Sequence, residues 1–449
     1  MVRIIGGGLA GSEAAWQIAS RGLPVTLHEM RPVRATRVHK TDRLAELVCS
    51  NSFRGSKLEN AVGLLKEEMR RIGSLVMCVA SETSVPAGAA LAVDRHRFAE
   101  GVTDALEHHP LVTIRREEIP RIPEHVAPES PVIVATGPLT SDELSADIAA
   151  VVGHDQLYFY DAISPIVLAD SIDRSKVFRA SRWGHGVEGD YLNCPLDEGE
   201  YKRLHDALVH ADRADVHDFD DTRFFEGCLP IEVMAHRGLD TLRFGPMKPV
   251  GLTDPTTGRR PHAVVQLRQD TIAADHYSLV GFQTQLKWGE QGRVLRLIPG
   301  LEAAEFVRYG MIHRNTYINA PTVLDDTWQV RGRPGLFFAG QISGVEGYVE
   351  SAASGLMAGL SAVALIEGRP ATAPPRTTAM GALAYYVSHA NPADYQPTNV
   401  AFGLLPSLEQ PPRNKRARRH QIAERALRDL ADWYDTAARA DERSPTVLS

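Results

Sequence analysis

The N-terminus of this chain contains residues spaced for dinucleotide binding. Gly6, Gly8 and Gly11 form the pattern G-x-G-x-x-G, and Glu29 follows eighteen residues after Gly11. Such glycines allow a tight turn and let a pyrophosphate approach the N-terminus of a helix, while the acidic side chain accepts hydrogen bonds from a ribose. A glycine-rich structural turn is the alternative. Because the whole unit is present, the pattern favours dinucleotide binding.

The segments around this turn are those that a βαβ unit requires. Apolar residues predict a strand over 2–5, a helix over 12–20 and a second strand over 24–28. Further on we expect a helix over 56–70, a helix over 95–108 capped by Asp94, and a buried strand over 132–135.

Glutamate rather than aspartate at position 29 favours FAD over NAD. Residues 135–137 (Ala-Thr-Gly) and 338–340 (Phe-Ala-Gly) also resemble the turns of FAD enzymes of the glutathione-reductase type. Gln341 departs from that type, in which an aspartate commonly follows the late glycine. The predicted FAD-binding residues are Gly6, Gly7, Gly8, Leu9, Ala10, Gly11, Glu29, Gly340, Gln341 and Tyr348.

The chain divides into segments of different character. We expect an α/β fold in which an FAD-binding, Rossmann-like domain of the glutathione-reductase type is interrupted by an inserted mixed α+β domain. Residues 1–155 would form the first part of the FAD domain and 156–320 the inserted substrate or RNA domain. Residues 321–449 would complete the FAD domain and add C-terminal helices, the last with Ile422, Ala426, Leu430 and Trp433 along one face.

Composition limits the class of protein. The 449 residues carry 49 Lys and Arg against 56 Asp and Glu, so the net charge of -7 excludes a generally basic nucleic-acid binder but not a local basic patch. We expect a cytoplasmic protein without membrane span or obligate protein partner. The four cysteines lack metal-ligand spacing, which predicts free thiols and no metal.

A second G-x-G-x-x-G pattern occurs at Gly184, Gly186 and Gly189. No strand pattern precedes it and no helical pattern follows it, so we interpret it as coincidental. Any NAD(P)H that reduces the flavin would therefore bind without a Rossmann domain of its own, at a place that the sequence does not reveal.

Several longer stretches resemble one group of flavoproteins. Residues 341–344 (Gln-Ile-Ser-Gly) and 347–351 (Gly-Tyr-Val-Glu-Ser) are similar to flavoproteins that modify tRNA uridines. Two such families compete, and the wobble-uridine enzymes are much longer than this chain. The stretches similar to the other, the TrmFO family, are 46–52, 160–165, 191–195, 225–230 and 309–317. This resemblance implies C5 methylation of the T-loop uridine of tRNA, position 54, with methylenetetrahydrofolate, FAD and NAD(P)H.

The implied reaction needs a reactive thiol. C5 of uracil is a poor nucleophile until a thiolate adds at C6, and a base must then remove the C5 proton. The family's cysteines fall on Cys228, which we assign as nucleophile, and Cys49, which we assign to proton abstraction; the roles can be exchanged. Free cysteines are also common packing residues, and we expect Cys78 and Cys194 to be structural, Cys78 within the core.

Other residues are candidates for binding substrates. Tyr348 is expected either to stack on the flavin or folate ring or to pack in the core. His313 and Arg314 either bind the folate or nucleotide or are structural. Five cations, Arg416 and Arg419 among them, lie within residues 413–419 and either contact tRNA phosphates or form a solvated helix face. Two other functions remain open: oxidation of a small metabolite by FAD, and the same methylation on ribosomal RNA.

Overall fold

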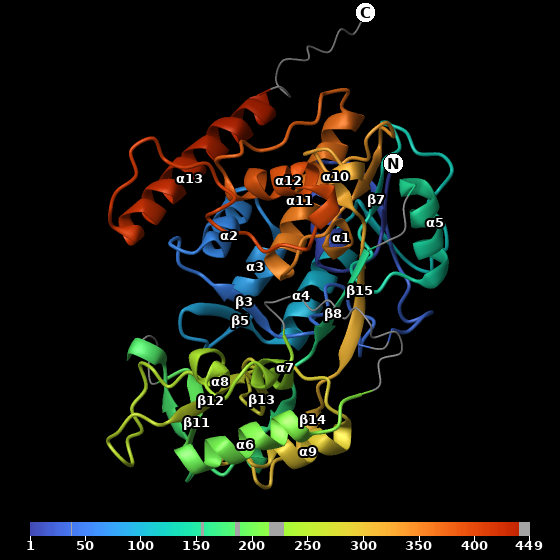
Figure 1. Ribbon diagram of the computed structural model, residues 1–449. Coiled ribbons are helices and arrows are strands. Elements are labelled where there is room, and N and C mark those ends of the chain that lie inside the picture. Colours follow the sequence, from blue (N-terminus) through green and yellow to red (C-terminus); the bar gives the residue numbers. More distant parts are fainter. Residues whose placement is uncertain (37, 154–156, 185–188, 215–228, 440–449) are drawn as a thin grey trace, which may run out of the picture.

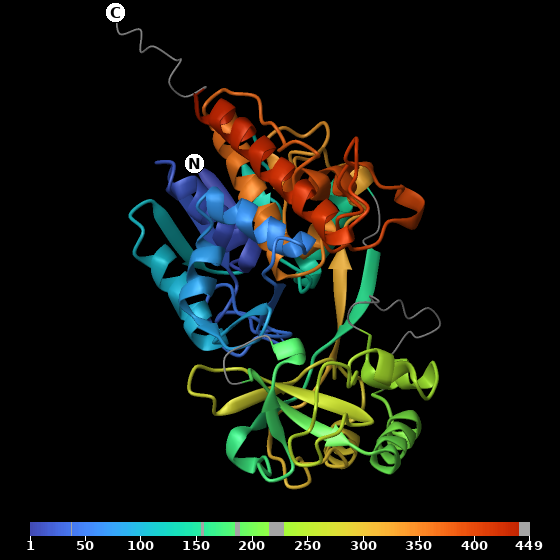
Figure 2. The same cartoon turned by 90° about the vertical axis from the view of Figure 1, so that its left-hand side faces the viewer.

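The computed structural model describes residues 1–36, 38–153, 157–184, 189–214 and 229–439. Within them the chain forms one body around a parallel sheet and a second body around an antiparallel sheet (Figure 1). The two-stranded ribbon of β8 (Leu157–Ala162) and β15 (Ile312–Tyr317) runs between the two bodies (Figure 2).

The first body is built on five parallel strands in the order β16-β7-β1-β2-β6. Their bounds are β1 Val2–Ile5, β2 Val25–Glu29, β6 Val112–Arg116, β7 Val132–Val134 and β16 Leu336–Phe338. β7 and β16 consist of apolar residues and β1 is apolar apart from Arg3, as expected when helices cover both faces of such a sheet. β16 comes from far along the chain and pairs with β7, so the late segment completes the sheet that the N-terminus begins.

Helices surround this sheet, and one pair packs unusually closely. The helices are α1 Leu9–Ala19, α2 Ala61–Arg71, α3 Leu75–Glu82, α4 Arg95–Glu107, α5 Asp142–Val152, α10 Ala320–Val323, α11 Tyr348–Ile366, α12 Ala379–His389 and α13 Lys415–Arg439. A Cβ at Gly355 of α11 would lie 2.0 Å from the carbonyl oxygen of Ala10 in α1, and one at Gly359 would lie 3.1 Å from that of Ala14. Small residues therefore let α1 and α11 meet backbone to backbone.

α11 is also the one helix in the described residues that is long and apolar enough to cross a membrane, with a mean hydropathy of 1.6 over eighteen residues. Of that window, 78% is buried inside the protein. Its composition is thus that of a core helix packed between α1 and the rest of the first body.

The second body is built on six strands in the order β10-β11-β12-β13-β9-β14. Their bounds are β9 Ile166–Leu168, β10 Phe178–Ala180, β11 Tyr191–Leu196, β12 Ala263–Gln269, β13 His276–Leu279 and β14 Phe306–Arg308. The helices are α6 Glu198–His210, α7 Ile231–His236, α8 Thr241–Phe244 and α9 Trp288–Leu295. A further small sheet joins β3 Ser52–Gly55, β5 Ala90–Val93 and β4 Ser84–Val85. The domain limits near 155 and 320 remain a prediction.

The expected fold class is confirmed, whereas one helix begins later than predicted. Asp94 caps α4 by accepting hydrogen bonds from the N–H groups of His96 and Arg97. α2 begins at Ala61 instead of residue 56, because the preceding residues fold back as a turn against the helix. Gly63 permits this close approach, since a Cβ there would lie 2.1 Å from the carbonyl oxygen of Lys57. After Gly189 the chain enters β11 rather than a helix, so the second glycine pattern does not begin a βαβ unit.

Candidate functional site

The turn between β1 and α1 is so tight that two of its glycines leave no room for a side chain. Gly6 has a φ of 107°, and a Cβ added there would lie 2.5 Å from the carbonyl oxygen of Ala135. A Cβ at Gly11 would lie 1.8 Å from the carbonyl oxygen of Gly6. α1 begins at Leu9 after Gly8, and within the described residues no side chain caps its N-terminus. Its first N–H groups are therefore available to an anion such as a pyrophosphate.

Glu29 ends β2 beside this turn. One carboxylate oxygen accepts a hydrogen bond from the N–H of Gly7 at 3.0 Å, and the other accepts from the N–H of Arg31 at 3.0 Å and its Nε at 2.8 Å. Burial alone would raise the pKa of Glu29, but the hydrogen bonds and charge of Arg31 outweigh it and lower the pKa. Because each oxygen of an ionised carboxylate accepts two bonds, the oxygen facing Gly7 can accept another.

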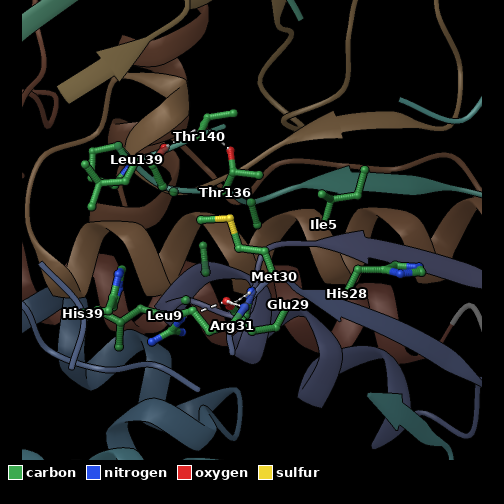
Figure 3. Close-up of a pocket in the computed structure, with 18 of the residues that line it drawn as sticks. Ile5, Leu9, His28, Glu29, Met30, Arg31, His39, Thr136, Leu139 and Thr140 are labelled. Carbon is green, nitrogen blue, oxygen red and sulfur yellow. Dashed lines mark hydrogen bonds and ion pairs between the residues drawn. The ribbon is translucent and has the colours of Figure 1, made fainter. Parts of the chain in front are cut away.

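A pocket lies beside this turn, at the carboxyl ends of the parallel strands. Figure 3 shows Thr136, Leu139 and Thr140 on one side of it and Glu29 and Arg31 on the other. The lining residues that were predicted to bind FAD are Gly6, Gly7, Gly8, Leu9, Ala10, Glu29, Gly340, Gln341 and Tyr348. Gly11 does not line the pocket. It lies behind the turn, where its lack of a side chain lets it pack against Gly6. The structure thus brings the early and the late glycine turns to one cavity.

The late glycine turn, at Gly340, forms a further wall of the pocket. Gly340 has a φ of 79°, and a Cβ there would lie 3.0 Å from the side chain of Ala10. Gln341 donates a hydrogen bond from Nε2 to the carboxylate of Glu346. FAD enzymes of the glutathione-reductase type commonly carry a negatively charged aspartate at this position. This chain instead carries an uncharged amide, and the amide nitrogen is already hydrogen-bonded within its own loop.

Tyr348, the first residue of α11, connects this pocket to Cys49. Its hydroxyl oxygen accepts hydrogen bonds from the N–H of Cys49 at 2.9 Å and of Ser50 at 3.1 Å. Burial raises the pKa of Tyr348 well above its usual value, so the phenol stays neutral. Tyr348 and Val48 both line the pocket, which places the loop of Cys49 at its end.

Two buried arginines hold the same loop. Arg95 of α4 donates from Nη1 to the carbonyl oxygen of Leu47 at 2.9 Å. Arg308 of β14 donates to the carbonyl oxygens of Val48 at 3.1 Å and Cys49 at 3.0 Å. Because Arg95 belongs to the first body and Arg308 to the second, the Cys49 loop is fixed where the two bodies meet. The Cys49 thiol itself points to the carbonyl oxygen of Ala162, 3.8 Å away.

Asn51 anchors the far end of this loop. Its amide nitrogen donates to the carbonyl oxygens of Val93 and Gln269, each at 2.9 Å, and its amide oxygen accepts from Nε of Arg268 at 2.8 Å. Asn51 is fully buried, so each of these bonds replaces one that water would otherwise make. The backbone around Cys49 is thereby rigid on both sides of the thiol.

The loop also lies in a positive environment. Arg95 is neutralised by Asp270 through two hydrogen bonds of 2.9 Å. Arg308 forms no ion pair within the described residues; burial, with the nearby charge of Arg95, lowers its pKa to about 10. It therefore remains charged at neutral pH. The positive charge of Arg308 beside the loop favours a negative charge there, such as a thiolate at Cys49.

Comparison with known proteins places these features in a family. A family model described as glucose inhibited division protein A matches residues 1–370. A relative from Desulforamulus reducens is 56% identical over 97% of this chain and 97% of its own length. Relatives from Geobacter sulfurreducens and Symbiobacterium thermophilum are 57% and 58% identical, covering 97% and 96% of this chain and 99% and 96% of their own. All three are named methylenetetrahydrofolate–tRNA-(uracil-5-)-methyltransferase TrmFO. This chain belongs to the TrmFO family.

A solved structure shares the fold. Aquifex aeolicus GidA, in one crystal form, aligns with a TM-score of 0.70 over 98% of this chain and 76% of that chain, at 17% sequence identity. Such a likeness shows the fold alone. It confirms the expected Rossmann-like α/β architecture, and GidA is the longer chain of the two.

The four cysteines of this TrmFO family member lie in different surroundings. Cys228 lies outside the described residues. Cys194 is fully buried in β11, and burial raises the pKa of its thiol far above the usual value, as a structural residue requires. The expectation that Cys78 is a core residue is wrong: it is exposed, with its sulfur 3.5 Å from the carboxylate of Glu82. The apolar stretch around Cys78 forms the helix α3, whose period turns this residue outward while its neighbours are buried.

The predicted substrate-binding residues lie on two separate elements, β15 and α13. His313 and Arg314 lie on β15, where their backbones pair with residues 161 and 160 of β8; their side chains lie outside what the structure describes. Arg416 and Arg419 lie at the start of α13. Arg416 forms an ion pair with Glu59 at 2.9 Å yet is 82% exposed, and Arg419 donates to the carbonyl oxygen of Glu59 at 3.3 Å.

Sequence reasoning missed the residues that position Cys49. Arg95, Arg308 and Asn51 act through contacts between segments far apart in the chain, so no local spacing reveals them. The one usable signal is that an arginine directly follows the cap residue Asp94. Among the described residues there is also no group of three or more His, Cys, Asp or Glu side chains that could hold a metal ion.

Proposed function

We propose that this protein methylates C5 of the T-loop uridine, position 54, of tRNA. Methylenetetrahydrofolate supplies the carbon, and FAD that has been reduced by NAD(P)H supplies a hydride. The observation that carries the proposal is the identity of 56–58% over at least 96% of this chain to relatives whose name gives the carbon donor, the RNA and the base.

The pocket has the features that FAD requires. We assign Glu29 to the adenosine ribose, the Gly6 to Gly11 turn with the N-terminus of α1 to the pyrophosphate, and the late turn with Tyr348 to the remainder of the cofactor. The reasons are that Gly6 and Gly11 leave no room for a side chain, so the turn is tight, and that no side chain caps the helix N-terminus in the described residues. FAD in this pocket supplies a hydride for reducing a methylene group to methyl.

The protein's own residues carry the covalent steps. The Cys228 thiolate forms a bond to C6 of uracil, which makes C5 nucleophilic, and C5 then bonds to the methylene carbon of the folate as the first of that carbon's two C–N bonds breaks. Cys49 accepts the proton from C5 as the second C–N bond breaks, which frees the folate and leaves an exocyclic methylene on the base. Breakage of the bond between sulfur and C6 releases the product as this methylene is reduced to methyl. The charge of Arg308 on the Cys49 loop favours the thiolate that this proton transfer needs. The opposite assignment of the two thiols satisfies the same chemistry.

The remaining candidates bind the two substrates. We assign His313 and Arg314 on the connecting ribbon to the folate or to the target nucleotide. Arg416 and Arg419 contact tRNA phosphates; Arg416 supports this best because its side chain is 82% exposed despite its ion pair. Residues 156–320 form the domain that faces the RNA, and tRNA and folate are the partners. With a tRNA substrate, we place the protein in the cytoplasm.

Two other functions are weaker. An FAD oxidase or dehydrogenase of a small metabolite would need neither cysteine, and nothing in the pocket favours it. Methylation of ribosomal RNA would use the same chemistry, but the relatives are named for tRNA. No specific observation supports either alternative over the methylation of tRNA.

A direct experiment is to incubate the purified protein with methylenetetrahydrofolate, NAD(P)H and an unmodified tRNA transcript, and to digest the RNA for nucleoside analysis. We expect 5-methyluridine at position 54, and none when the folate is left out. A ribosomal RNA fragment serves as the competing substrate. Methylation of that fragment but not of tRNA would contradict the proposal.

The carbon source is tested separately with labelled S-adenosylmethionine in place of the folate. We expect no label in the RNA, because the described pocket is accounted for by FAD and the relatives are named for the folate donor. Incorporation of label by the pure protein would overturn the mechanism even if the product were 5-methyluridine.

A further inference from the structure

Four side chains form an aromatic stack in the second body, on the helix α9 and the strand β14, each with the residue that follows it. These two elements lie near each other (Figure 1). The rings of Phe306 and Tyr309 stack with centroids 5.2 Å apart and planes inclined by 23°. The ring of Trp288 stacks with that of Tyr309 at 6.5 Å and 21°. The guanidinium of Arg296 lies 5.5 Å from the centroid of the Phe306 ring. We call Trp288, Tyr309, Phe306 and Arg296 the aromatic stack.

The outer ring of the stack, Trp288, is open to solvent, whereas Phe306 and Tyr309 are half-buried and Phe306 packs against the core of the second body. Trp288 is 62% exposed, and the apolar side chains of Val307 and Leu297 nearby in the chain are 52% and 39% exposed. Single exposed apolar residues are ordinary on protein surfaces. A nearly parallel series of aromatic rings that begins with an exposed indole is different, because its flat face is available to a further ring.

Positive charge accompanies these rings. Lys287, exposed at the N-terminus of α9, forms no ion pair within the residues that the structure describes. Arg296 also forms no ion pair there, although its guanidinium donates to the carbonyl oxygens of Gly292 at 3.2 Å and Ala304 at 2.9 Å, whereas Arg293 is paired with Glu290 at 2.6 Å. An exposed aromatic ring beside a cation that has no ion pair is the combination by which proteins bind unpaired RNA: a base stacks on the ring and a phosphate contacts the cation. A hydrophobic protein partner would not need the cations.

The stack is also connected to the Cys49 loop. Arg308, which donates to the carbonyl oxygens of Val48 and Cys49, stands between Val307 and Tyr309 in the chain. An RNA strand whose target base lies at Cys49 therefore has neighbouring nucleotides within reach of the stack. A base extruded from a folded loop leaves its neighbours unstacked, and each of them then needs a new stacking surface.

We infer that the aromatic stack binds an unpaired base of the substrate RNA close to the uridine that is methylated, with Trp288 as the outer ring. This inference rests on the proposed function, since it takes the substrate to be RNA. It adds a determinant of RNA affinity that contacts neither the flavin pocket nor the reacting atoms.

The test compares Trp288→Ala and Trp288→Phe with Phe244→Ala, a control at a side chain of α8 that is 82% exposed. Binding of the holoenzyme to an unmodified tRNA transcript is measured by fluorescence anisotropy, and KM and kcat for the same tRNA are measured by methylation. We expect Trp288→Ala to raise Kd and KM by about 5- to 150-fold, the range for loss of one base stacked on an aromatic ring. Trp288→Phe should stay within a few-fold of wild type, with flavin content and kcat unchanged in both.

Three results would overturn the inference. The first is a Kd for Trp288→Ala equal to that of Phe244→Ala. The second is a raised KM for NAD(P)H with that for tRNA unchanged, which would make the stack a nicotinamide or adenine site. The third is a dimer in wild type that only Trp288→Ala dissociates, with Kd for tRNA unaltered. Failure of the proposed function is distinguishable, because it requires that wild type form no 5-methyluridine.

Discussion

The glycine turn and the Cys49 loop line the same cavity but are encoded in different ways. Two contacts that shape the turn lie within the first twenty-nine residues, because Glu29 binds Gly7 and Gly11 packs on Gly6; Gly6 also packs on Ala135. The Cys49 loop is instead held by Arg95, by Arg308 and by the Tyr348 hydroxyl. The turn is thus specified locally, whereas the loop exists only when both bodies have folded and met.

This difference matches what each region does. A pyrophosphate needs a short cradle of backbone N–H groups, which one turn can supply. A thiol that must meet an RNA base and a folate needs positioning relative to two separate binding sites, and such placement within a fraction of an ångström is worth orders of magnitude in rate. Changes in the turn should therefore affect the cofactor, and changes around the loop should affect turnover while the cofactor remains.

The largest effect is expected from the cysteines. Cys49→Ala should lower turnover by at least about 10³-fold, because the thiol that accepts the C5 proton is lost. FAD should stay bound, because the backbone N–H and C=O contacts of residue 49 do not depend on the thiol. Cys228→Ala should abolish the covalent adduct with RNA that contains 5-fluorouridine, in which no proton can leave C5. Adduct formation is measured by denaturing electrophoresis and turnover by nucleoside analysis.

Cys78→Ala is the matched control, since this thiol is exposed and outside the pocket. It should leave turnover unchanged and alter stability by less than about 0.5 kcal/mol. If Cys228→Ala still forms the adduct and Cys49→Ala does not, the two roles are reversed. Normal methylation by both variants would show that the thiols are structural.

The next largest effect is expected at Gly11. Gly11→Val places a Cβ 1.8 Å from the carbonyl oxygen of Gly6, so the turn must open. The purified variant should be colourless and less stable by about 1–3 kcal/mol or more. Flavin absorbance and a denaturant titration of the apoprotein measure the two consequences.

A substitution at Gly8 distinguishes an effect on the packing of the turn from an effect on the approach of the cofactor. A Cβ at Gly8 meets nothing within 4 Å, as at Gly403, an exposed glycine outside the pocket lining. Gly8→Ala should therefore keep the stability of the apoprotein but weaken FAD binding, because the second glycine of the pattern lets the backbone approach the pyrophosphate. Gly403→Ala should change neither. Full flavin affinity in Gly8→Ala would place the pyrophosphate elsewhere.

A smaller effect is expected at Arg308. Arg308→Met removes the hydrogen bonds to Val48 and Cys49 and the charge beside the thiol, so kcat should fall by about 10- to 100-fold. The flavin content should stay at the wild-type level. Arg293→Met, which breaks an exposed ion pair on α9, is the control and should leave kcat unchanged. Loss of FAD in Arg308→Met would mean that the loop and the turn are not independent.

The same contrast explains how far sequence reasoning reached. The strands β1 and β2, the turn, Glu29 and the cap at Asp94 are set by neighbours in the chain, and local patterns predicted them. The return of β16 to the first sheet was predictable because its apolar run and glycine turn repeat those of the N-terminus. Cys78 was misjudged because a short apolar run was treated as uniformly buried, although a helix exposes one side of it.

Arg308, Asn51 and the Tyr348 hydroxyl were beyond prediction for a different reason. Each is defined by the partner that it meets in space: Asn51 bonds residues of β5 and β12, and Arg308 reaches from β14 to the Cys49 loop. Their residue types occur throughout the chain at positions without such contacts. Only the arrangement of the two bodies distinguishes them.

Lys66 supplies the last test, which concerns stability rather than activity, beside the segment that follows the Cys49 loop. It is fully buried, and its Nζ donates to the carbonyl oxygens of Phe53 and Arg54 at 3.0 Å each and to the Ser56 hydroxyl at 3.4 Å. These bonds fix β3, which follows the Cys49 loop. Burial, with the charges of Arg70 and Arg54, lowers the pKa of Lys66 from 10.5 to about 7.

The sign of the pH dependence follows from this shift. Between pH 7 and about 10 the unfolded chain holds a proton on Lys66 that the folded protein has released, so the free energy of unfolding rises with pH. Relative to Lys66→Met, wild type should gain at most about 1.4 kcal/mol per pH unit in this window and nothing below pH 7. Denaturant titrations at several pH values measure it, with the exposed Lys57→Met as control. A difference independent of pH would mean that Lys66 remains charged in the fold, stabilised by its three acceptors.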